Sequence, residues 1–560
     1  MKLFKDDLAL YHALKKSMDE ELLTWAEKPL NNFHELCYNE FDERAVHTDR
    51  EGQPKLVKYN KLGDDVSYIW VNEGYKKTVE QTYNSGIVGY VHKTIPELNR
   101  KGNYMLSYAQ GYLLSQVEPG FYCPVTLTMA TAYLIEHFAD EELKANYLPH
   151  VISTGEVELY EGATFLSERQ GGSDVGANEV RAEKCGDHYQ LFGEKYFASN
   201  AGMCGVATVL ARIDGAESGT KGLSLFLVPW KKDDGSLNGI EVRRLKDKLG
   251  VRAVPSAEIV FNGATAYLIG DPKKGFYYMM EALNLSRVCN AVASIGIMRR
   301  AYVEAKNYAE WREAFGNKII TYPMVRKTLV DLLARYEVQT SAVFELIPLF
   351  DRVMTNLSQA TKQEKAMNRL LIALLKARTA EEAIDFSHEA IEIHGGNGYM
   401  EDFVTPRLLR DAQVLTVWEG TANILGLEVL RLFKKFNVHS DFMNMISSKL
   451  ESLPTYLDAE AGIVKQKLEK LKETVAYVTS KSEQEETYHI KSVANLMTDI
   501  YLCTVALTDV ESEGDRKHLL AKVFIAHTWD DGEVIDTSLL PLTHFDELVY
   551  AKGSEVEIHQ

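Results

Sequence analysis

The spacing of apolar residues along the chain changes twice, and each change predicts a new kind of domain. Residues 1–158 are mainly helical in pattern, with leucine, isoleucine and aromatic positions at helical spacing over 7–27 and 140–152. Two short alternating runs, at 55–59 and 66–71, predict a small β excursion. We therefore expect an N-terminal helical domain that contains this excursion.

At about residue 159 the pattern becomes that of β-strands. Residues 159–272 are rich in valine, isoleucine, tyrosine, phenylalanine and glycine turns. Strands are predicted over 189–193, 206–212, 223–229 and 257–261, with turns between them. Short strands at this spacing are typical of a small β-barrel or sandwich domain.

From residue 273 to about 436 the chain is helical again. The spacing predicts three long helices, over 286–314, 322–353 and 363–394. A helical domain, a β domain and a helical-bundle domain thus follow one another, so the fold class is α+β and multidomain.

Residues 437–560 form an additional helical extension, with a boundary near 437–441 and helices predicted over 448–480 and 487–510. From residue 431 onward there are 14 Lys and Arg against 22 Asp and Glu, a difference of −8. The whole chain has a formal net charge of −18. This acidity disfavours non-specific binding to nucleic acid or to a membrane surface.

Composition is that of a globular protein with sizeable cores, since 46% of the 560 residues are apolar. No apolar run is long enough to predict a transmembrane helix, and residues 1–20 lack the apolar core of a signal peptide. The six cysteines form no C-x-x-C pair, which is typical of reduced thiols. We expect a cytoplasmic protein. His388 and His394 are six residues apart, where a zinc-binding helix needs four, so no metal site is visible.

The candidate catalytic residue is Glu419, in the stretch Val-Trp-Glu-Gly-Thr-Ala-Asn-Ile at 417–424. It lies between a large aromatic residue and a glycine, and Thr421 is a good N-cap for the amphipathic helix that follows. A carboxylate half out of water in a turn at a helix start has the chemistry of a general base. From these residues alone, a solvated acid in the first helical turn remains an alternative.

A glycine-rich turn, Gly-Gly-Asn-Gly-Tyr at 395–399, and Arg410-Asp411 precede this stretch. This ordered set resembles the C-terminal signature of the acyl-CoA dehydrogenase family, in which the glutamate of the Tyr/Trp-Glu-Gly-Thr turn is the catalytic base. The order of domains resembles the family architecture over roughly residues 100–436. Together with Arg-Leu-Lys-Asp-Lys-Leu-Gly at 244–250 and the helical extension, the chain looks most like the adaptive-response (AidB-like) branch.

Two clusters in the β domain resemble the flavin contacts of that family. Residues 165–174 resemble its Thr-Glu-Pro-x-x-Gly-Ser-Asp loop, with serine for the threonine and arginine for the proline. Residues 193–200 resemble its Gly-x-Lys-x-Trp-Ile-Thr-Asn strand, with phenylalanine and serine for the tryptophan and threonine. A polar turn, a core phenylalanine and a surface serine are the structural alternatives. The resemblance implies FAD contacts from Leu166, Ser167, Ser173, Phe197 and Ser199, and a substrate contact from Ser173.

Further FAD contacts are implied in the helical bundle. Arg312 lies in an Arg-x-x-Phe-Gly sequence whose arginine, in the family, reaches the FAD diphosphate of a neighbouring subunit; the guanidinium fork matches phosphate oxygens. An arginine that stabilises a helix C-terminus is the alternative. The resemblance thus implies a homodimer or homotetramer. The implied cofactor contacts are Arg312, Phe315, Glu392, Gly395, Gly396, Thr421 and Asn423, with Glu392 standing where the family commonly has glutamine.

Some branches of the family place the base in a Leu-Glu-Arg sequence on another helix. Here that sequence is Leu285-Ser286-Arg287, and a serine cannot serve as that base, so Glu419 is left as the candidate. Arg287 either shapes the acyl-CoA pocket as a substrate contact or is a structural ion-pair arginine.

The resemblance implies an oxidoreductase of fatty acid metabolism that converts an acyl-CoA to a trans-2-enoyl-CoA and passes electrons to an electron-transfer flavoprotein. An acyl-CoA oxidase is an alternative, although the sequence ends at Gln560 without a peroxisomal Ser-Lys-Leu. A DNA-associated adaptive-response flavoprotein is another, but that role resembles one built on a basic C-terminal region, and this region is acidic. A flavin-free scaffold is the third.

Overall fold

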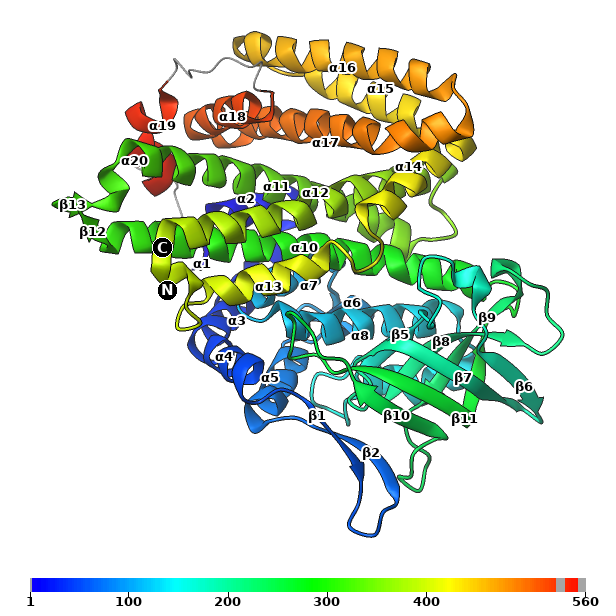
Figure 1. The fold of residues 1–560 in the computed structure, drawn as a ribbon. Helices are drawn as coiled ribbons and strands as arrows, with labels where there is room; N and C mark the ends of the chain where they lie inside the picture. The colour runs from blue at the N-terminus through cyan, green and yellow to red at the C-terminus, as the bar shows by residue number, and fades with distance from the viewer. Residues whose placement is uncertain (1–2, 530–538, 552–560) are drawn as a thin grey trace. The chain divides into compact units, whose positions relative to one another are not determined.

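A computed structural model describes residues 3–529 and 539–551 of the chain (Figure 1). The chain divides into two units: unit 1 contains Thr24–Cys289, and unit 2 contains Lys2–Leu23 and Asn290–Gln560. Helices α3 (Glu20–Leu36) and α10 (Gly275–Trp311) pass from one unit to the other. The finer division into four domains stays a prediction from the sequence pattern.

Unit 1 begins with helices and a short β hairpin. The two alternating runs pair antiparallel, as predicted. The helix predicted over 7–27 is instead two helices, because Met18 is extended and Asp19 Oδ1 accepts the N–H of Leu22 to start the second. The first two helices of the chain, α1 (Leu3–Asp6) and α2 (Leu8–Ser17), belong to unit 2. After α3, the elements of unit 1 are α4 (Asp42–Arg50), β1 (Lys55–Tyr59), β2 (Asp65–Trp70), α5 (Glu73–Asn84), α6 (Gly89–His92), β3 (Thr94–Ile95), β4 (Arg100–Lys101), α7 (Tyr104–Ser115), α8 (Pro119–Phe138) and α9 (Glu141–Val151).

The following strands close into a barrel, one of the two expected architectures. They are β5 (Gly162–Phe165), β6 (Arg181–Cys185), β7 (His188–Ser199), β8 (Val206–Ile213), β9 (Leu223–Pro229), β10 (Ile240–Leu245) and β11 (Ser256–Ile269). The pairs β11–β7, β7–β6, β6–β8, β8–β9 and β9–β11 form a ring, and closure satisfies strand edges. The strands predicted over 189–193 and 257–261 are parts of the longer β7 and β11.

Unit 2 is a helical bundle that includes the second half of α10. This helix begins earlier than predicted, and residues 313–318 form a hairpin where helix was predicted to continue to 314. The hairpin turns at Phe315 and Gly316, both with positive φ, a conformation that a helix does not contain. The elements are β12 (Glu313–Ala314), β13 (Asn317–Lys318), α11 (Pro323–Thr355), α12 (Lys362–His394), α13 (Thr405–Leu415) and α14 (Ala422–Phe436).

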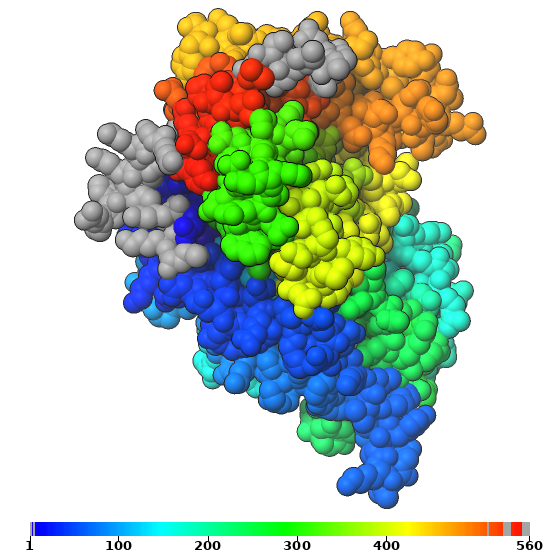
Figure 2. Space-filling model, turned by 60° about the vertical axis from the view of Figure 1, so that its left-hand side comes forward, coloured from blue at the N-terminus to red at the C-terminus, as the bar shows by residue number. Residues whose placement is uncertain are grey.

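The C-terminal extension packs on the bundle within unit 2, where Figure 2 shows its orange and red helices against the green ones. The helix predicted over 448–480 is two helices, because Pro454 follows the end of the first. Arg516 and Glu337 form a buried ion pair between the extension and α11. The elements are α15 (Val438–Glu451), α16 (Asp458–Thr479), α17 (Glu483–Glu513), α18 (Asp515–Thr528), α19 (Leu540–Thr543) and α20 (Phe545–Tyr550).

Within the described part of the chain, α17 alone is long and apolar enough to cross a membrane, judged by length and composition. Of its most apolar window, 72% is buried inside the protein. Burial of this extent is typical of a core helix, whose apolar side chains pack against neighbouring helices.

Candidate active site

Glu419 lies in a tight turn between α13 and α14. Its φ is +54° and that of Gly420 is +109°, so two consecutive residues are in the left-handed region. Glycine adopts this conformation freely, whereas a residue with a side chain pays of order 1–3 kcal/mol. Thr421 occupies the N-cap position of α14, as predicted, although its hydroxyl makes no capping bond. The predicted catalytic base therefore lies in a strained turn.

Side chains from two other helices hold this turn. Asn290 Nδ2, from α10, donates to Glu419 Oε2 at 2.8 Å and to the carbonyl of Leu415 at 3.0 Å. Lys376 Nζ, from α12, donates to the carbonyl of Gly420 at 2.7 Å. Asn290 and Lys376 are 4% and 1% exposed, while Glu419 is half-buried. The carboxylate is thus oriented by buried partners and keeps contact with solvent.

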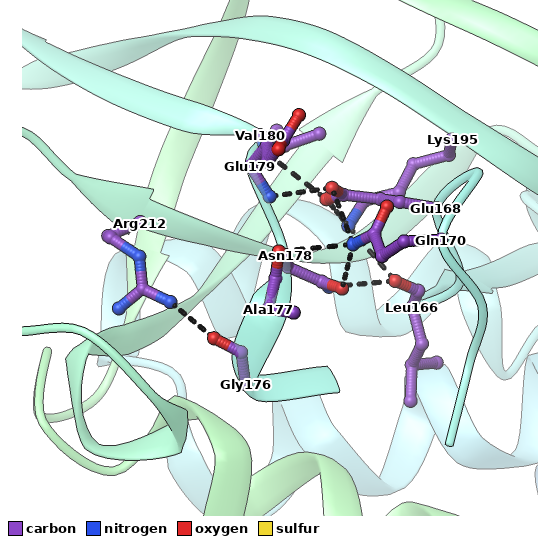
Figure 3. A network of polar contacts seen from close by, with 10 residues as sticks. All are labelled: Leu166, Glu168, Gln170, Gly176, Ala177, Asn178, Glu179, Val180, Lys195 and Arg212. Carbon is purple, nitrogen blue, oxygen red and sulfur yellow. Dashed lines mark hydrogen bonds and ion pairs between the residues drawn. The ribbon is translucent and has the colours of Figure 1, made fainter. Parts of the chain in front are cut away.

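In unit 1, a buried ion pair holds the loop after β5 (Figure 3). Lys195 Nζ lies 2.8 Å from Glu168 Oε1, and the two side chains are 0% and 4% exposed. Glu168 also accepts the backbone N–H of Glu179 at 2.6 Å and of Val180 at 3.2 Å. Burial, opposed by Glu168, lowers the pKa of Lys195 to about 8, so the ammonium keeps its proton at pH 7. This network fixes the loop that contains Ser167.

The loop lies beside β7, as the flavin prediction requires. The N–H of Tyr196 donates to the carbonyl of Ser167 at 3.0 Å. A Cβ on Gly172 would come within 2.2 Å of Ser167 Oγ, so a side chain at this position would displace the serine hydroxyl. Ser173 is exposed, and the carbonyl of Leu166 accepts hydrogen bonds from Asn178 Nδ2 at 2.8 Å and from Lys195 Nζ of β7 at 3.1 Å.

Phe197 and Ser199 are two residues apart on β7 and so share one face, as predicted. Phe197 is 54% exposed, and Ser199 Oγ lies 3.4 Å from Ser256 Oγ. Lys246 Nζ, from the basic run after β10, lies 4.8 Å from the centre of the Phe197 ring. An exposed aromatic face with a hydroxyl and a cation beside it fits a flat ring with polar edges, such as a flavin.

In unit 2, the end of α10 lies beside the glycine-rich turn after α12. The rings of Tyr308 and His394 stack with their centres 4.2 Å apart, and Asn397 Nδ2 donates to the Tyr308 hydroxyl at 3.0 Å. Arg312 and Phe315 follow on the exposed side of this junction, and Phe315 is 96% exposed. The structure therefore brings two of the predicted FAD-binding segments together.

The other predicted residues of unit 2 are exposed at helix ends: Glu392, Gly395, Gly396, Thr421 and Asn423. Apart from the immediate chain neighbours, no atom of the described residues lies within 4 Å of the Cβ positions of Gly395 and Gly396, which leaves space for a ligand or a second chain. Arg287 is 6% exposed on α10, and its Nη1 donates to Asn284 Oδ1 at 3.3 Å. Both roles considered for Arg287 remain predictions.

Sequence reasoning missed Asn290 and Lys376. A signal for the first was present, because Ser286, Asn290 and Ser294 recur every four residues within an otherwise apolar part of α10, and all three are buried. A polar stripe on a buried helix face indicates side chains that bind something inside the protein. Lys376 has no comparable signal in its own segment.

The fold and the site together define a class of protein. A helical segment, a closed barrel with an exposed aromatic platform, and a bundle with a carboxylate in a strained turn are the parts of a flavin-dependent oxidoreductase. Three family models match the chain in order: the adaptive response protein AidB N-terminal domain over residues 1–155, the acyl-CoA dehydrogenase middle domain over 163–264, and the acyl-CoA dehydrogenase C-terminal domain over 273–432.

Individual proteins of the same family are similar to this chain over most of its length. Acyl-CoA dehydrogenase family member 11 of Caenorhabditis elegans is 32% identical over 510 residues, which cover 88% of this chain and 81% of that protein. Putative acyl-CoA dehydrogenase AidB of Escherichia coli K12 is 33% identical over 426 residues, covering 74% and 76%. The crystal structure of C. elegans ACDH-11 in complex with C11-CoA matches with a TM-score of 0.87 at 27% identity, covering 99% and 96%. The chain belongs to the acyl-CoA dehydrogenase family of FAD-dependent oxidoreductases, and its likeness to AidB confirms the predicted branch.

Proposed function

We propose that this protein catalyses the α,β-dehydrogenation of an acyl-CoA thioester to a trans-2-enoyl-CoA, with Glu419 as the general base. The observation that supports this best is the turn at Glu419, where a half-buried carboxylate is held in a strained conformation by a buried amide.

Different residues of the chain would bind the cofactor, bind the substrate and remove the proton. FAD, when bound, accepts the β-hydrogen of the substrate as a hydride. Phe197, which is 54% exposed, would offer a stacking face for the ring, and the hydroxyls of Ser167 and Ser199 would bond its polar edge. Glu419 takes the α-proton, and Ser173 contacts the substrate.

The enzyme would work with a neighbouring subunit and with an electron acceptor. Arg312 and Phe315, both exposed, would contact the FAD of a neighbouring subunit in a homodimer or homotetramer. Electrons would pass to an electron-transfer flavoprotein, and the enzyme would act in the cytoplasm. The C11-CoA bound to ACDH-11 supports an acyl-CoA as the substrate.

Anaerobic bleaching of the flavin by a panel of acyl-CoA thioesters, from butyryl-CoA to palmitoyl-CoA with branched members, tests the proposal. We expect at least one thioester to bleach the flavin in a single turnover and to be converted to the enoyl-CoA. A purified protein that contains FAD and is bleached by none of them contradicts the proposal. Stoichiometric hydrogen peroxide during aerobic turnover would identify an acyl-CoA oxidase instead, and salt-dependent binding of duplex DNA would support the adaptive-response alternative.

A further inference from the structure

We propose that Asn290 is a positioning residue that holds the carboxylate of Glu419 in the orientation needed for proton abstraction. This inference rests on the function proposed above, since it concerns the same base. Asn290 itself need not touch the substrate. It acts through the hydrogen bond from Nδ2 to Glu419 Oε2, at 2.8 Å.

The orientation of the Asn290 amide follows from a second contact. A backbone carbonyl only accepts hydrogen bonds, so the carbonyl of Leu415, 3.0 Å away, must face the NH₂ group. That group has two hydrogens, and the second points to Glu419. The amide cannot turn its oxygen toward Glu419 without losing the bond to Leu415. Asn290 therefore offers Glu419 a donor, and the hydrogen bond fixes the direction in which the carboxylate points.

The oxygen of the Asn290 amide gives further support for a role in binding Glu419. Its Oδ1 is buried and has no hydrogen-bond partner among the described residues, although most buried polar atoms have one. An apolar residue of similar shape would avoid this unsatisfied oxygen. The gain that offsets it is the pair of bonds made by Nδ2, one to the end of α13 and one to the base.

Lys376 supports the same turn from α12. Its ammonium donates to the carbonyl of Gly420, the second residue with a left-handed φ. A strained turn persists only where its surroundings hold it. Asn290 thus holds the side chain of Glu419, while Lys376 holds the backbone that follows.

Purified FAD-containing Asn290→Leu and Asn290→Ala variants test the inference. Both side chains lack the donor, and leucine keeps roughly the shape of asparagine. We expect either change to lower the rate of flavin reduction by acyl-CoA at least about 10-fold, with the dissociation constant for acyl-CoA within about threefold of wild type. The matched control is Asn368→Leu, because Asn368 is also a buried asparagine, 1% exposed, but lies on α12 rather than α10. The control should reduce its flavin at the wild-type rate.

A double-mutant cycle with Glu419→Met separates this inference from the proposed function, because methionine has nearly the length of glutamate but no carboxylate to accept the bond from Asn290 Nδ2. Asn290→Leu should slow the Glu419→Met variant far less than it slows wild type. The two changes should be non-additive in urea unfolding by at least about fivefold in the equilibrium constant. Additive unfolding shows that the contact is absent and overturns the inference. Non-additive unfolding with wild-type reduction by both Asn290 variants overturns the positioning role. If no acyl-CoA bleaches even wild type, the proposed function fails, and the unfolding cycle still decides whether Asn290 holds Glu419.

Discussion

Replacing Lys195 by methionine would remove one half of the buried ion pair that fixes the loop after β5. Methionine has nearly the length of lysine and fills the same space without a charge. Glu168 would keep its two backbone donors, at 2.6 and 3.2 Å, but would lose the cation 2.8 Å away while remaining 4% exposed. The change therefore leaves a buried carboxylate without its counter-ion.

The magnitude follows from two opposing effects. Removing one partner of a buried ion pair costs about 3–5 kcal/mol. The pKa of Lys195 is lowered to about 8 by burial, which means that its ammonium is itself poorly solvated, and this part of the cost disappears with the charge. We therefore expect Lys195→Met to lower the free energy of unfolding by about 3 kcal/mol, the lower end of that range.

Equilibrium unfolding in urea at pH 7, followed by circular dichroism, measures this effect where variant and wild type share the same denaturant slope. The double variant Glu168→Gln with Lys195→Met should lose less than the sum of the two single changes, because no unpaired charge remains. The control is Lys144→Met, which removes an exposed ion pair with Glu141 and should cost less than about 0.5 kcal/mol. A loss below about 0.5 kcal/mol for Lys195→Met, or an additive double variant, would refute the reasoning.

Two further predictions concern pH and stability. Burial raises the pKa of Glu161 from 4.5 to about 7, so the folded protein keeps a proton that the unfolded chain releases, and stability falls as pH rises from about 4.5 to 7. Glu161→Gln should reduce the difference in the free energy of unfolding between pH 4.5 and pH 8, measured in urea, by up to about 3 kcal/mol. An unchanged difference would contradict the assignment. Arg516 and Lys517 hold the pKa of the buried Glu337 at about 2, so its contribution is present above pH 4.5 and is lost as pH falls toward 2. Glu337→Gln should lower stability at pH 7 by about 3–5 kcal/mol in the same assay, and a change below about 1 kcal/mol would show that this pair does not anchor the extension.

Local pattern was enough to predict the elements whose signal lies within a few residues. The alternation at 55–59 and 66–71 became β1 and β2, and the strand over 223–229 became β9 with the same limits. The break at Met18 was missed because helical spacing of apolar residues continues across it, and only the capping bond of Asp19 shows where the second helix starts. Periodicity predicts which face is buried but not where a cap interrupts the chain.

The candidate site was predictable as a set of segments but not as a set of contacts. The Trp-Glu-Gly-Thr turn could be placed before a helix because Thr421 and the following apolar spacing are local signals. The hydrogen bond between Asn290 and Glu419 joins residues 129 positions apart, and that between Lys376 and Gly420 joins residues 44 apart. A single sequence contains no pattern that pairs such distant residues, so these contacts required the fold.

The most direct test of the central claim is the rate of anaerobic flavin reduction in Glu419→Gln with the best acyl-CoA of the panel. Glutamine keeps the size of the side chain and an oxygen that can accept from Asn290 Nδ2, so FAD binding and thermal stability should stay at wild-type values. If Glu419 is the base, bleaching should slow by at least about 100-fold, the usual contribution of general base catalysis. Bleaching at the wild-type rate would contradict the account.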